Sequence, residues 1–394
     1  MLKNIALLLC GCVITLEGFS QSTAIDIALQ DIEQNNLELQ ALVSLGENKR
    51  LELLSGNQPP DPQIGAYYLP FGAHTPGDYW EFEISQSIEF PTVYGARKKW
   101  IDAQVLEADL ALRIRRQAIL LSSEQLCIEL IHLRKRYVLE MERFEQAKKI
   151  EEQIAVLHEK GQVGILELNK AKVAWMQVQF TVQHLENEEN GLLLSLMDLN
   201  GGQALAFEAT AYERDLLLTE KDTLWREMLA RDPVLRQLDQ RQAIAAQGMK
   251  VAKSEGLPDI TAGYNYQGIA GSNYSGVYAG LSIPLWSNKH KVNAARSDLT
   301  YQKAVFSAET TQARIGFEKR YQTYQLQFSE YEEYRSTLDG LNSEALLLQA
   351  YVLGEISFLE YHMELQFYRQ AIDAMLLREK DLHLNKAELQ RHQL

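Results

Sequence analysis

Apolar residues recur every three or four positions over long stretches of this chain, which is the pattern of a helix with one buried face. The clearest stretch covers residues 93–158, whose other face carries charged runs such as Arg134-Lys135-Arg136. The pattern predicts one unbroken helix there, roughly 100 Å long at 1.5 Å per residue. Globular helices average about 11–12 residues, so an element this long is typical of a coiled coil or a helical bundle.

A second stretch, residues 287–351, is as long and similarly patterned, so it predicts a second long helix. Glycine ends both stretches, at Gly161 and Gly354, and a shorter helical pattern follows each glycine. The sequence therefore predicts two helical hairpins, each with a tight glycine turn. The shorter helices cover residues 165–199 and 357–390, and one more helix opens each half of the chain, at 24–56 and 221–255.

Two windows switch to a period of two, which predicts strands. Trp80–Phe90 and Val277–Ile283 alternate apolar with small or polar residues, and Gln63–Leu69 and Ile260–Gln267 are the predicted partner strands. The segments between them are rich in glycine, so each window is predicted to form a hairpin. The predicted hairpin loops are Phe71–Gly77 and Gly268–Gly276.

The two faces of these strands differ in polarity. One face is apolar and consists of Trp80, Phe82, Ile84, Ile88, Phe90, Val277, Leu281 and Ile283. Glutamates, with serines between them, take the opposite face of the first hairpin, at Glu81, Glu83 and Glu89. Such alternation suits a barrel strand with lipid outside and water inside, or an amphipathic hairpin packed on a soluble core.

The chain is an internal repeat. All nine prolines lie within residues 59–91 and 233–284, and long helical patterns follow both windows. Asn36 and Asp232 are 196 residues apart, whereas Gly161 and Gly354 are 193 apart, so the register holds with one three-residue deletion. The predicted division is a signal peptide at 1–20, a first repeat at 21–200 (strands about 63–90, hairpin 93–199), a linker at 201–220, and a second repeat at 221–394 (strands about 260–284, hairpin 287–390).

The N-terminus has the pattern of a secretory signal: Lys3, an apolar run, then small residues up to Ser20. Leu9-Cys10-Gly11-Cys12 also loosely resembles a lipobox that would acylate Cys12. Cleavage after Ser20 would leave Cys127 as the single cysteine, which excludes an intramolecular disulfide. No later stretch reaches the ~18 apolar residues of a membrane-spanning helix, so a membrane span would have to consist of strands.

Charge and motifs exclude several classes of protein. The net charge of −14 argues against a nucleic-acid partner. The sequence holds no HExxH, CxxC, GxSxG, GxGxxG or P-loop, so neither an enzyme nor a cofactor or metal site is predicted. His362, near Glu360 and Glu364, is interpreted as part of a solvated helix face.

Four strands do not close a barrel around a channel, and an open sheet edge does not face lipid. Copies of the same chain would close it economically, since three chains supply twelve strands. The order of strands and hairpins, the segment SQSIEFPTVYGARKK (85–99) and its counterpart LSIPLWSNKHK (281–291) resemble the TolC family of outer-membrane efflux channels. The hairpin turns also match that family's G-x-(V/I)-x-x-L-(D/E) pattern, in GQVGILE and GEISFLE. The first segment looks most like the branch paired with heavy-metal-cation exporters.

The resemblance implies a mainly α trimer: a twelve-stranded barrel in the outer membrane and a long α-barrel in the periplasm, with residues 201–220 in its equatorial belt. It implies a passive exit duct of a tripartite pump that works with a periplasmic adaptor and an inner-membrane resistance-nodulation-division transporter. Drug efflux and type I secretion stay open as alternatives. A periplasmic adaptor or coiled-coil envelope protein would explain the helices, but not the repeated hairpins together with the alternating strands.

Two sets of site residues follow from the resemblance. The glycine turns would be the tip that docks the adaptor, through Gly161, Gln162, Val163, Gly354, Glu355 and Ile356. Glu167 and Glu360 lie six residues past each turn and would form acidic rings at a gate, although surface salt bridges are the alternative. Apart from these two sets, the same logic of carboxylate rings would place Glu81, Glu83 and Glu89, on the polar face of the strands, along the lumen of the barrel.

Overall fold

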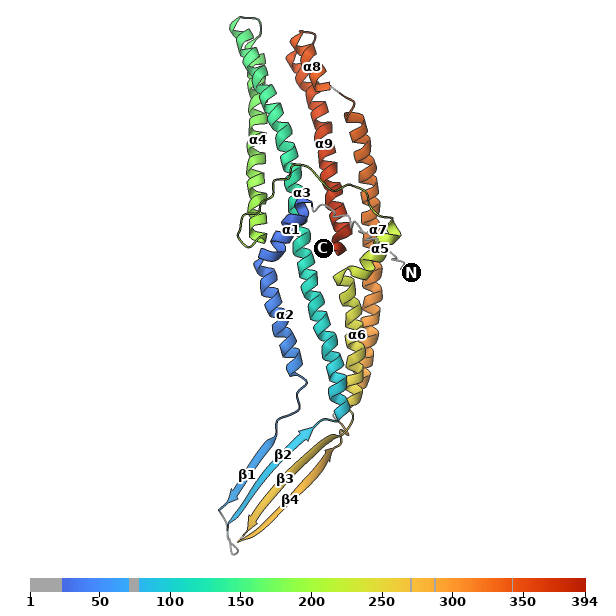
Figure 1. The fold of residues 1–394 in the computed structure, drawn as a ribbon. Coiled ribbons are helices and arrows are strands. Elements are labelled where there is room, and N and C mark those ends of the chain that lie inside the picture. The colour runs from blue at the N-terminus through green and yellow to red at the C-terminus, as the bar shows by residue number, and fades with distance from the viewer. Residues whose placement is uncertain (1–22, 71–77, 270, 287, 342) are drawn as a thin grey trace, which may run out of the picture.

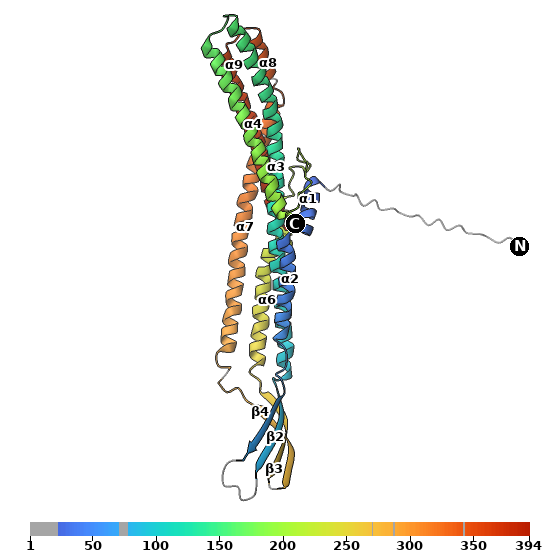
Figure 2. The same ribbon diagram turned by 90° about the vertical axis from the view of Figure 1, so that its left-hand side faces the viewer.

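The protein is a long rod with a small β-sheet at one end and two helical turns at the other (Figures 1 and 2). The computed structural model describes residues 23–70, 78–269, 271–286, 288–341 and 343–394. The predicted signal peptide and the predicted loop Phe71–Gly77 lie outside the described residues.

The predicted strands form a single antiparallel sheet in the order β1-β2-β3-β4. They are β1 (Gln63–Leu69), β2 (Tyr79–Ile88), β3 (Asp259–Ile269) and β4 (Ser272–Ser282). The strands from the two halves of the chain meet where β2 pairs with β3, with Ile84 opposite Tyr264. The predicted loop Gly268–Gly276 is wrong, because both strands extend into it and leave only residues 270 and 271 between them.

The first helical hairpin agrees with its prediction. Helix α3 runs unbroken over Pro91–Glu159, and α4 (Ile165–Leu199) returns along it. The second hairpin differs, because the predicted helix 287–351 is interrupted. It consists of α7 (Lys291–Leu338) and α8 (Ser343–Val352), and α9 (Phe358–Gln390) returns from the tip.

The two predicted opening helices are each broken once, at equivalent positions of the repeat. Asn36 separates α1 (Ala24–Asn35) from α2 (Leu37–Ser55), and Asp232 separates α5 (Lys221–Arg231) from α6 (Pro233–Ser254). Each of the two side chains caps the helix that follows: Asn36 accepts from the Leu39 N–H (2.9 Å), and Asp232 from the Val234 N–H (3.0 Å). A short 3₁₀ turn, Arg391–Gln393, follows α9.

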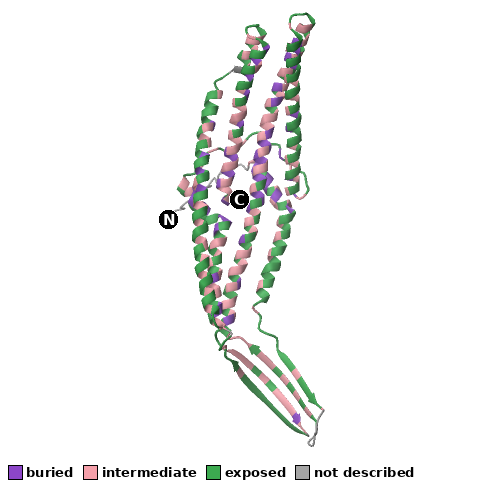
Figure 3. Ribbon diagram, turned by 180° about the vertical axis from the view of Figure 1, so that it is seen from behind, coloured by how far each residue is buried: buried purple, intermediate pink, exposed green. Residues whose placement is uncertain are grey.

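The core lies around the middle of the rod, and a smaller one lies under the tip, whereas the sheet is largely exposed (Figure 3). The segment after α4 crosses the middle of the rod (Figure 1). Arg134 of α3 holds this segment against the helix, because the Nη1 of Arg134 donates to the carbonyls of Phe207 (2.9 Å) and Ala209 (3.1 Å). Within the described residues, no helix combines the length and the apolar character needed to cross a membrane.

Candidate functional site

The two turns at the tip have the same backbone geometry. Gly161 has φ +70°, its N–H donates to His158 O (2.9 Å), and the N–H of Gln162 donates to Leu157 O (2.9 Å). This is the Schellman ending of a helix. The second turn repeats it 193 residues later, with Gly354 at φ +75° and with the bonds Gly354 N to Tyr351 O (3.0 Å) and Glu355 N to Ala350 O (2.9 Å).

Glycine is favoured at both turns because of the backbone, not because of crowding. Other residues seldom adopt a positive φ, since their Cβ meets the following carbonyl. A Cβ built on Gly161 or Gly354 would meet no atom within 4 Å among the described residues. Both turns therefore present open surface at the end of the rod.

The predicted docking residues divide into two groups. Gly161, Gln162, Gly354 and Glu355 are exposed. Val163 and Ile356 are half-buried and pack on one shared apolar cluster. The members of this cluster come from α3, α4 and α9, and they are Ile150, Ile154, Leu168, Ala171, Phe358, Tyr361 and Leu365. The cluster joins the two hairpins below their turns.

Apolar side chains beside the turns are a feature that the sequence analysis did not assign to the site. Leu166 is 71% exposed, and its repeat equivalent Leu359 is 48% exposed. Val352 and Leu353 precede the second turn and are also exposed. A groove of about 790 Å³ lies between the turns, with Val352, Val163 and Ile356 among its lining residues. The signal was present in the repeated motif, because both leucines stand five residues after the glycine.

The two predicted gate acids have different surroundings. Glu360 belongs to a capping box at the start of α9: its carboxylate accepts the Ser357 N–H (2.8 Å), and the Ser357 hydroxyl accepts the Glu360 N–H (3.3 Å). The interaction of the Glu360 carboxylate with the backbone N–H of Ser357, and with the hydroxyl of the same residue, holds the pKa of Glu360 below its usual range. Glu167 lacks such a partner, because Gly164 precedes α4 as its N-cap. It lines the groove, and its charge adds to burial in raising the pKa of Tyr351.

The apolar face of the sheet is uncovered by the described chain. Trp80, Phe82 and Ile84 are 47%, 39% and 40% exposed, and Val277 and Leu281 of β4 are more exposed still. The register places Ile84 opposite Tyr264 and Tyr264 opposite Val277, so one apolar surface runs across the strands. Of the other predicted members, Ile88 is half-buried at the end of β2, whereas Phe90 and Ile283 lie beyond the ends of their strands.

The polar face is organised by two glutamates. Glu81 accepts hydrogen bonds from Tyr79 (2.5 Å), Gln267 (3.3 Å) and Asn265. Glu83 accepts a hydrogen bond from Tyr278 of β4. These bonds link three strands across one face.

Glu89 does not belong to that polar face, which corrects the prediction. The strand ends at Ile88, and the Glu89 carboxylate pairs with both terminal nitrogens of Arg97 at 2.6 and 2.8 Å. No group of three metal-ligating side chains occurs among the residues that the structure describes.

This rod, with its sheet and two hairpins, is the fold of outer-membrane channel proteins, as solved structures show. CusC, studied for the conformational changes that accompany folding and transmembrane channel formation, matches with a TM-score of 0.77 and 12% identity over 93% of this chain and 91% of its own. The Campylobacter jejuni outer-membrane channel CmeC matches with 0.73 and 13% identity over 94% and 85%. The outer-membrane protein VceC of Vibrio cholerae matches with 0.72 and 13% identity over 93% and 94%.

No protein-family model matches the chain, and its sequence matches none of the curated proteins. At 12–13% identity the solved structures show the fold alone. The predicted TolC-like fold is thereby confirmed.

Proposed function

We propose that this protein is the outer-membrane channel of a tripartite efflux pump, a passive duct without a reaction or a cofactor. The observation that carries the proposal is the sheet at one end of the rod, whose apolar face the described chain leaves uncovered. A sheet with one apolar face and one hydrogen-bonded acidic face suits lipid on one side and water on the other. The likeness to solved outer-membrane channels supports the same reading.

The edges of the sheet favour closure by copies of the same chain. β1 and β4 are the outer strands, and with four antiparallel strands they run in opposite directions. β4 of one copy can therefore pair in antiparallel fashion with β1 of the next, which removes every open edge from the lipid. We propose a homotrimer with a barrel of twelve strands.

Unpartnered apolar side chains on the helices support the same assembly. Helix α2 has no buried residue among those described, and three of its apolar side chains, Leu37, Val43 and Leu45, are more than 60% exposed. Leu326 and Tyr301 on α7 are also more than 60% exposed. Neighbouring copies would cover these positions in an α-barrel.

The proposed cargo is a heavy-metal cation, and the supporting observation is the pair of glutamates on the polar face of the sheet. Glu81 and Glu83 share the polar face of the sheet, where a ring of carboxylates would favour cations. Drug efflux and type I secretion are the alternatives for the same duct. The proposed location is the outer membrane of a Gram-negative bacterium, with the helices in the periplasm, after export directed by a signal peptide at residues 1–20. Acylation of Cys12 is the alternative processing, since cleavage after Ser20 would remove this cysteine.

The first experiment is the native mass of the full chain extracted by detergent from purified outer membranes. A stable trimer is the expected result, because the strands of one copy do not close a channel. A monomer in the soluble periplasmic fraction would overturn the proposal and favour a periplasmic adaptor or a coiled-coil envelope protein.

The tip is proposed to dock the periplasmic adaptor that connects the duct to a resistance-nodulation-division transporter. Gly354→Trp places a bulky side chain in the open space of the second turn, and Gly354→Asn is the matched control, because Asn tolerates a positive φ. The Trp variant should assemble as a trimer but lose export, whereas the Asn variant should keep both. Loss of assembly in the Trp variant would make the turn purely structural, and normal export would remove it from the docking surface.

A further inference from the structure

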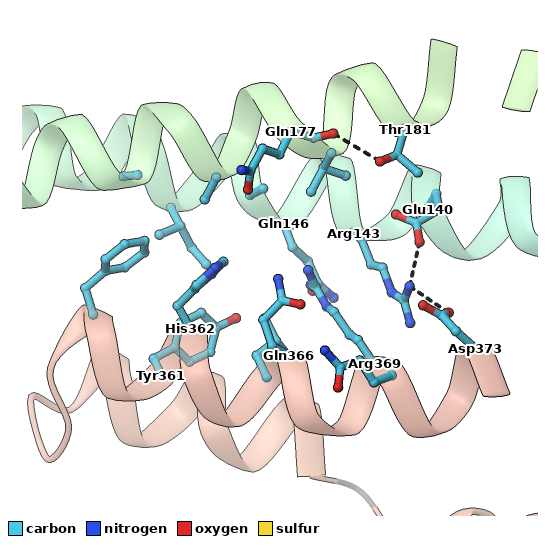
Figure 4. Close-up of a pocket in the computed structure, with 18 of the residues that line it drawn as sticks. Glu140, Arg143, Gln146, Gln177, Thr181, Tyr361, His362, Gln366, Arg369 and Asp373 are labelled. Carbon is cyan, nitrogen blue, oxygen red and sulfur yellow. Dashed lines mark hydrogen bonds and ion pairs between the residues drawn. The ribbon is translucent and has the colours of Figure 1, made fainter. Parts of the chain in front are cut away.

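A cavity of about 370 Å³ lies between the two helical hairpins, below the tip (Figure 4). Helices α3 and α4 form one wall, and α9 forms the other. Two arginines enter it from opposite sides: Arg143 from α3 and Arg369 from α9 (Figure 4). They are only 3% and 8% exposed, so both cations are removed from bulk solvent.

One nitrogen of the Arg143 guanidinium makes hydrogen bonds, and the other two make none to the described residues. Its Nη1 donates to Glu140 (2.5 Å) and to Asp373 of α9 (3.0 Å). Among the described residues, its Nε and Nη2 have no hydrogen-bond partner. These two nitrogens are the side-on pair of the guanidinium, whose two parallel N–H groups match the two oxygens of a carboxylate or a phosphate.

Arg369 is also incompletely paired. Its Nε has no hydrogen-bond partner within the described part of the chain, since the nearest carboxylate, that of Glu344, lies 4.0 Å away. Its Nη2 makes one long bond of 3.4 Å, to Gln146. Burial lowers the pKa of Arg369, the charge of Glu344 opposes this, and the neighbouring charge of Arg143 lowers the pKa further, so the two cations are close enough to repel each other.

A buried donor without a hydrogen-bond partner destabilises the fold, and a charged donor does so more strongly. The rest of the lining can add hydrogen bonds to a polar guest, because it is rich in amides and hydroxyls. Those side chains are Gln146, Gln177, Thr181, Tyr361, Gln366 and Gln370.

We propose that this cavity binds a small oxyanion, carrying a carboxylate or a phosphate group, on the unpaired edge of Arg143 and on Arg369. The two arginines belong to different hairpins, so a bound oxyanion would bridge α3 and α9 and hold the hairpins together. This site is separate from the proposed docking tip and from the proposed lumen of the sheet.

The test is isothermal titration of the full chain, purified in detergent, with inorganic phosphate and with succinate at constant ionic strength. Saturable binding of at least one probe is expected, and the preferred probe identifies a phosphate or a carboxylate as the ligand group. Arg143→Lys keeps a cation beside Glu140 and Asp373 but removes the side-on pair, so binding should weaken roughly ten-fold or more. Arg335→Gln, at an exposed arginine of α7, is the control and should bind like the parent.

Two outcomes overturn the proposal. Absence of saturable binding of both probes would mean that water alone fills the cavity. Equal binding by the parent and Arg143→Lys would place the anion elsewhere. If Arg143→Lys fails to fold by circular dichroism, Arg369→Lys answers the same question from the other hairpin.

Discussion

The two helical hairpins end in the same turn but are built differently below it. Helix α3 runs through 69 residues, whereas α7 stops at Leu338 and α8 resumes at Ser343. The repeat offset of 193 aligns Asp339-Gly340 of the break with Gln146-Ala147 inside α3. Gln and Ala favour helix, whereas Asp and Gly disfavour it. The difference in helix propensity thus accounts for one hairpin having an unbroken helix and the other a broken one, although both sequences have the same hydrophobic period.

Burial separates the hairpins further. Helix α3 contributes buried aliphatic side chains along most of its length, whereas α7 buries only Phe317, Tyr321, Tyr324 and Tyr331 among its described residues. Helix α3 packs against α4, α6, α9 and α2 within one copy. The comparison indicates that the first hairpin forms most of the packed interior of the described chain, while α7 keeps exposed faces that the proposed trimer would cover.

The largest effect on stability is expected from proline substitutions at matched positions of the two hairpins, which test whether the helix is continuous in one and broken in the other. Ala147→Pro removes a backbone bond from the interior of α3 and should lower the free energy of unfolding by about 3 kcal/mol or more. Gly340→Pro, at the equivalent position in the break, should cost less, because α7 ends at Leu338 and no helix interior is interrupted. Its remaining cost comes from Asp339, whose αR dihedrals a following proline disfavours. Thermal unfolding followed by circular dichroism measures both, and equal losses would show that the break does not uncouple α8 from α7.

Acid should weaken the interface between the hairpins. His383 of α9 is buried and His132 of α3 is half-buried, and this desolvation, together with nearby lysines and arginines, lowers their pKa values to about 3 and about 4. Each is neutral in the fold and binds a proton below about pH 6.5 when unfolded. The stability that they contribute is therefore present above pH 6.5 and is lost as the pH falls toward the folded pKa, by about 1.4 kcal/mol per pH unit for each histidine.

His383→Phe keeps the stacking on Tyr212, whose ring centre lies 3.9 Å from that of His383, but removes the titration. The fall in unfolding temperature between pH 7 and pH 5 should be smaller for this variant than for the parent. His184→Gln, at an exposed position of α4, is the control and should leave the fall unchanged. An unaltered fall in His383→Phe would contradict the role of burial.

A smaller effect on stability is expected when the N-cap residues of the two returning helices, α4 and α9, are exchanged in type. Ser357→Ala breaks the capping box of α9 and should cost about 1 kcal/mol. Gly164→Ser places serine three residues before Glu167, where a Cβ meets no atom within 4 Å among the described residues. It should build the same box on α4 and add a few tenths of a kcal/mol. Thermal unfolding checks both signs, and a loss of stability in Gly164→Ser would contradict the equivalence of the turns.

The smallest effect on stability is expected from Glu360→Gln and Glu167→Gln. Gln also completes the capping box at position 360, and Glu167 takes part in no capping box. Their effect should appear in cation preference, measured as a reversal potential in planar bilayers. Glu360 is held in place by Ser357, so its loss should shift the potential more than the loss of Glu167. Unchanged potentials in both variants would remove these acids from the gate.

The sequence predicted the parts of the fold that depend on local pattern. The alternation around Phe82 and Ile84 identified strand β2, and Gly161 and Gly354 identified both turns. The breaks at Asn36 and Asp232 were not predicted, although Pro233 directly after Asp232 is a signal for a new helix start. Asn36 and Asp232 are buried caps whose partners come from distant segments, Leu199 and Arg391.

The candidate site was predictable to a similar extent. The turns and their exposed residues followed from the repeat, but the role of Glu360 as a cap needed the position of Ser357 relative to the first turn of α9. The cavity could not be predicted, because Arg143 and Arg369 are 226 residues apart and a charged residue on a helix indicates a solvent-facing side. Only the packing of α3 against α9 buries them together.

The open edges of the sheet have a genetic consequence. Each copy offers one β1 edge and one β4 edge, and the proposed trimer has no spare edge to substitute for a damaged one. A single defective subunit would therefore spoil the whole assembly. When normal and defective copies are made in equal amounts and mix freely, about one trimer in eight contains only normal chains. An allele that damages β1 or β4 without preventing assembly should thus behave as dominant over the normal gene.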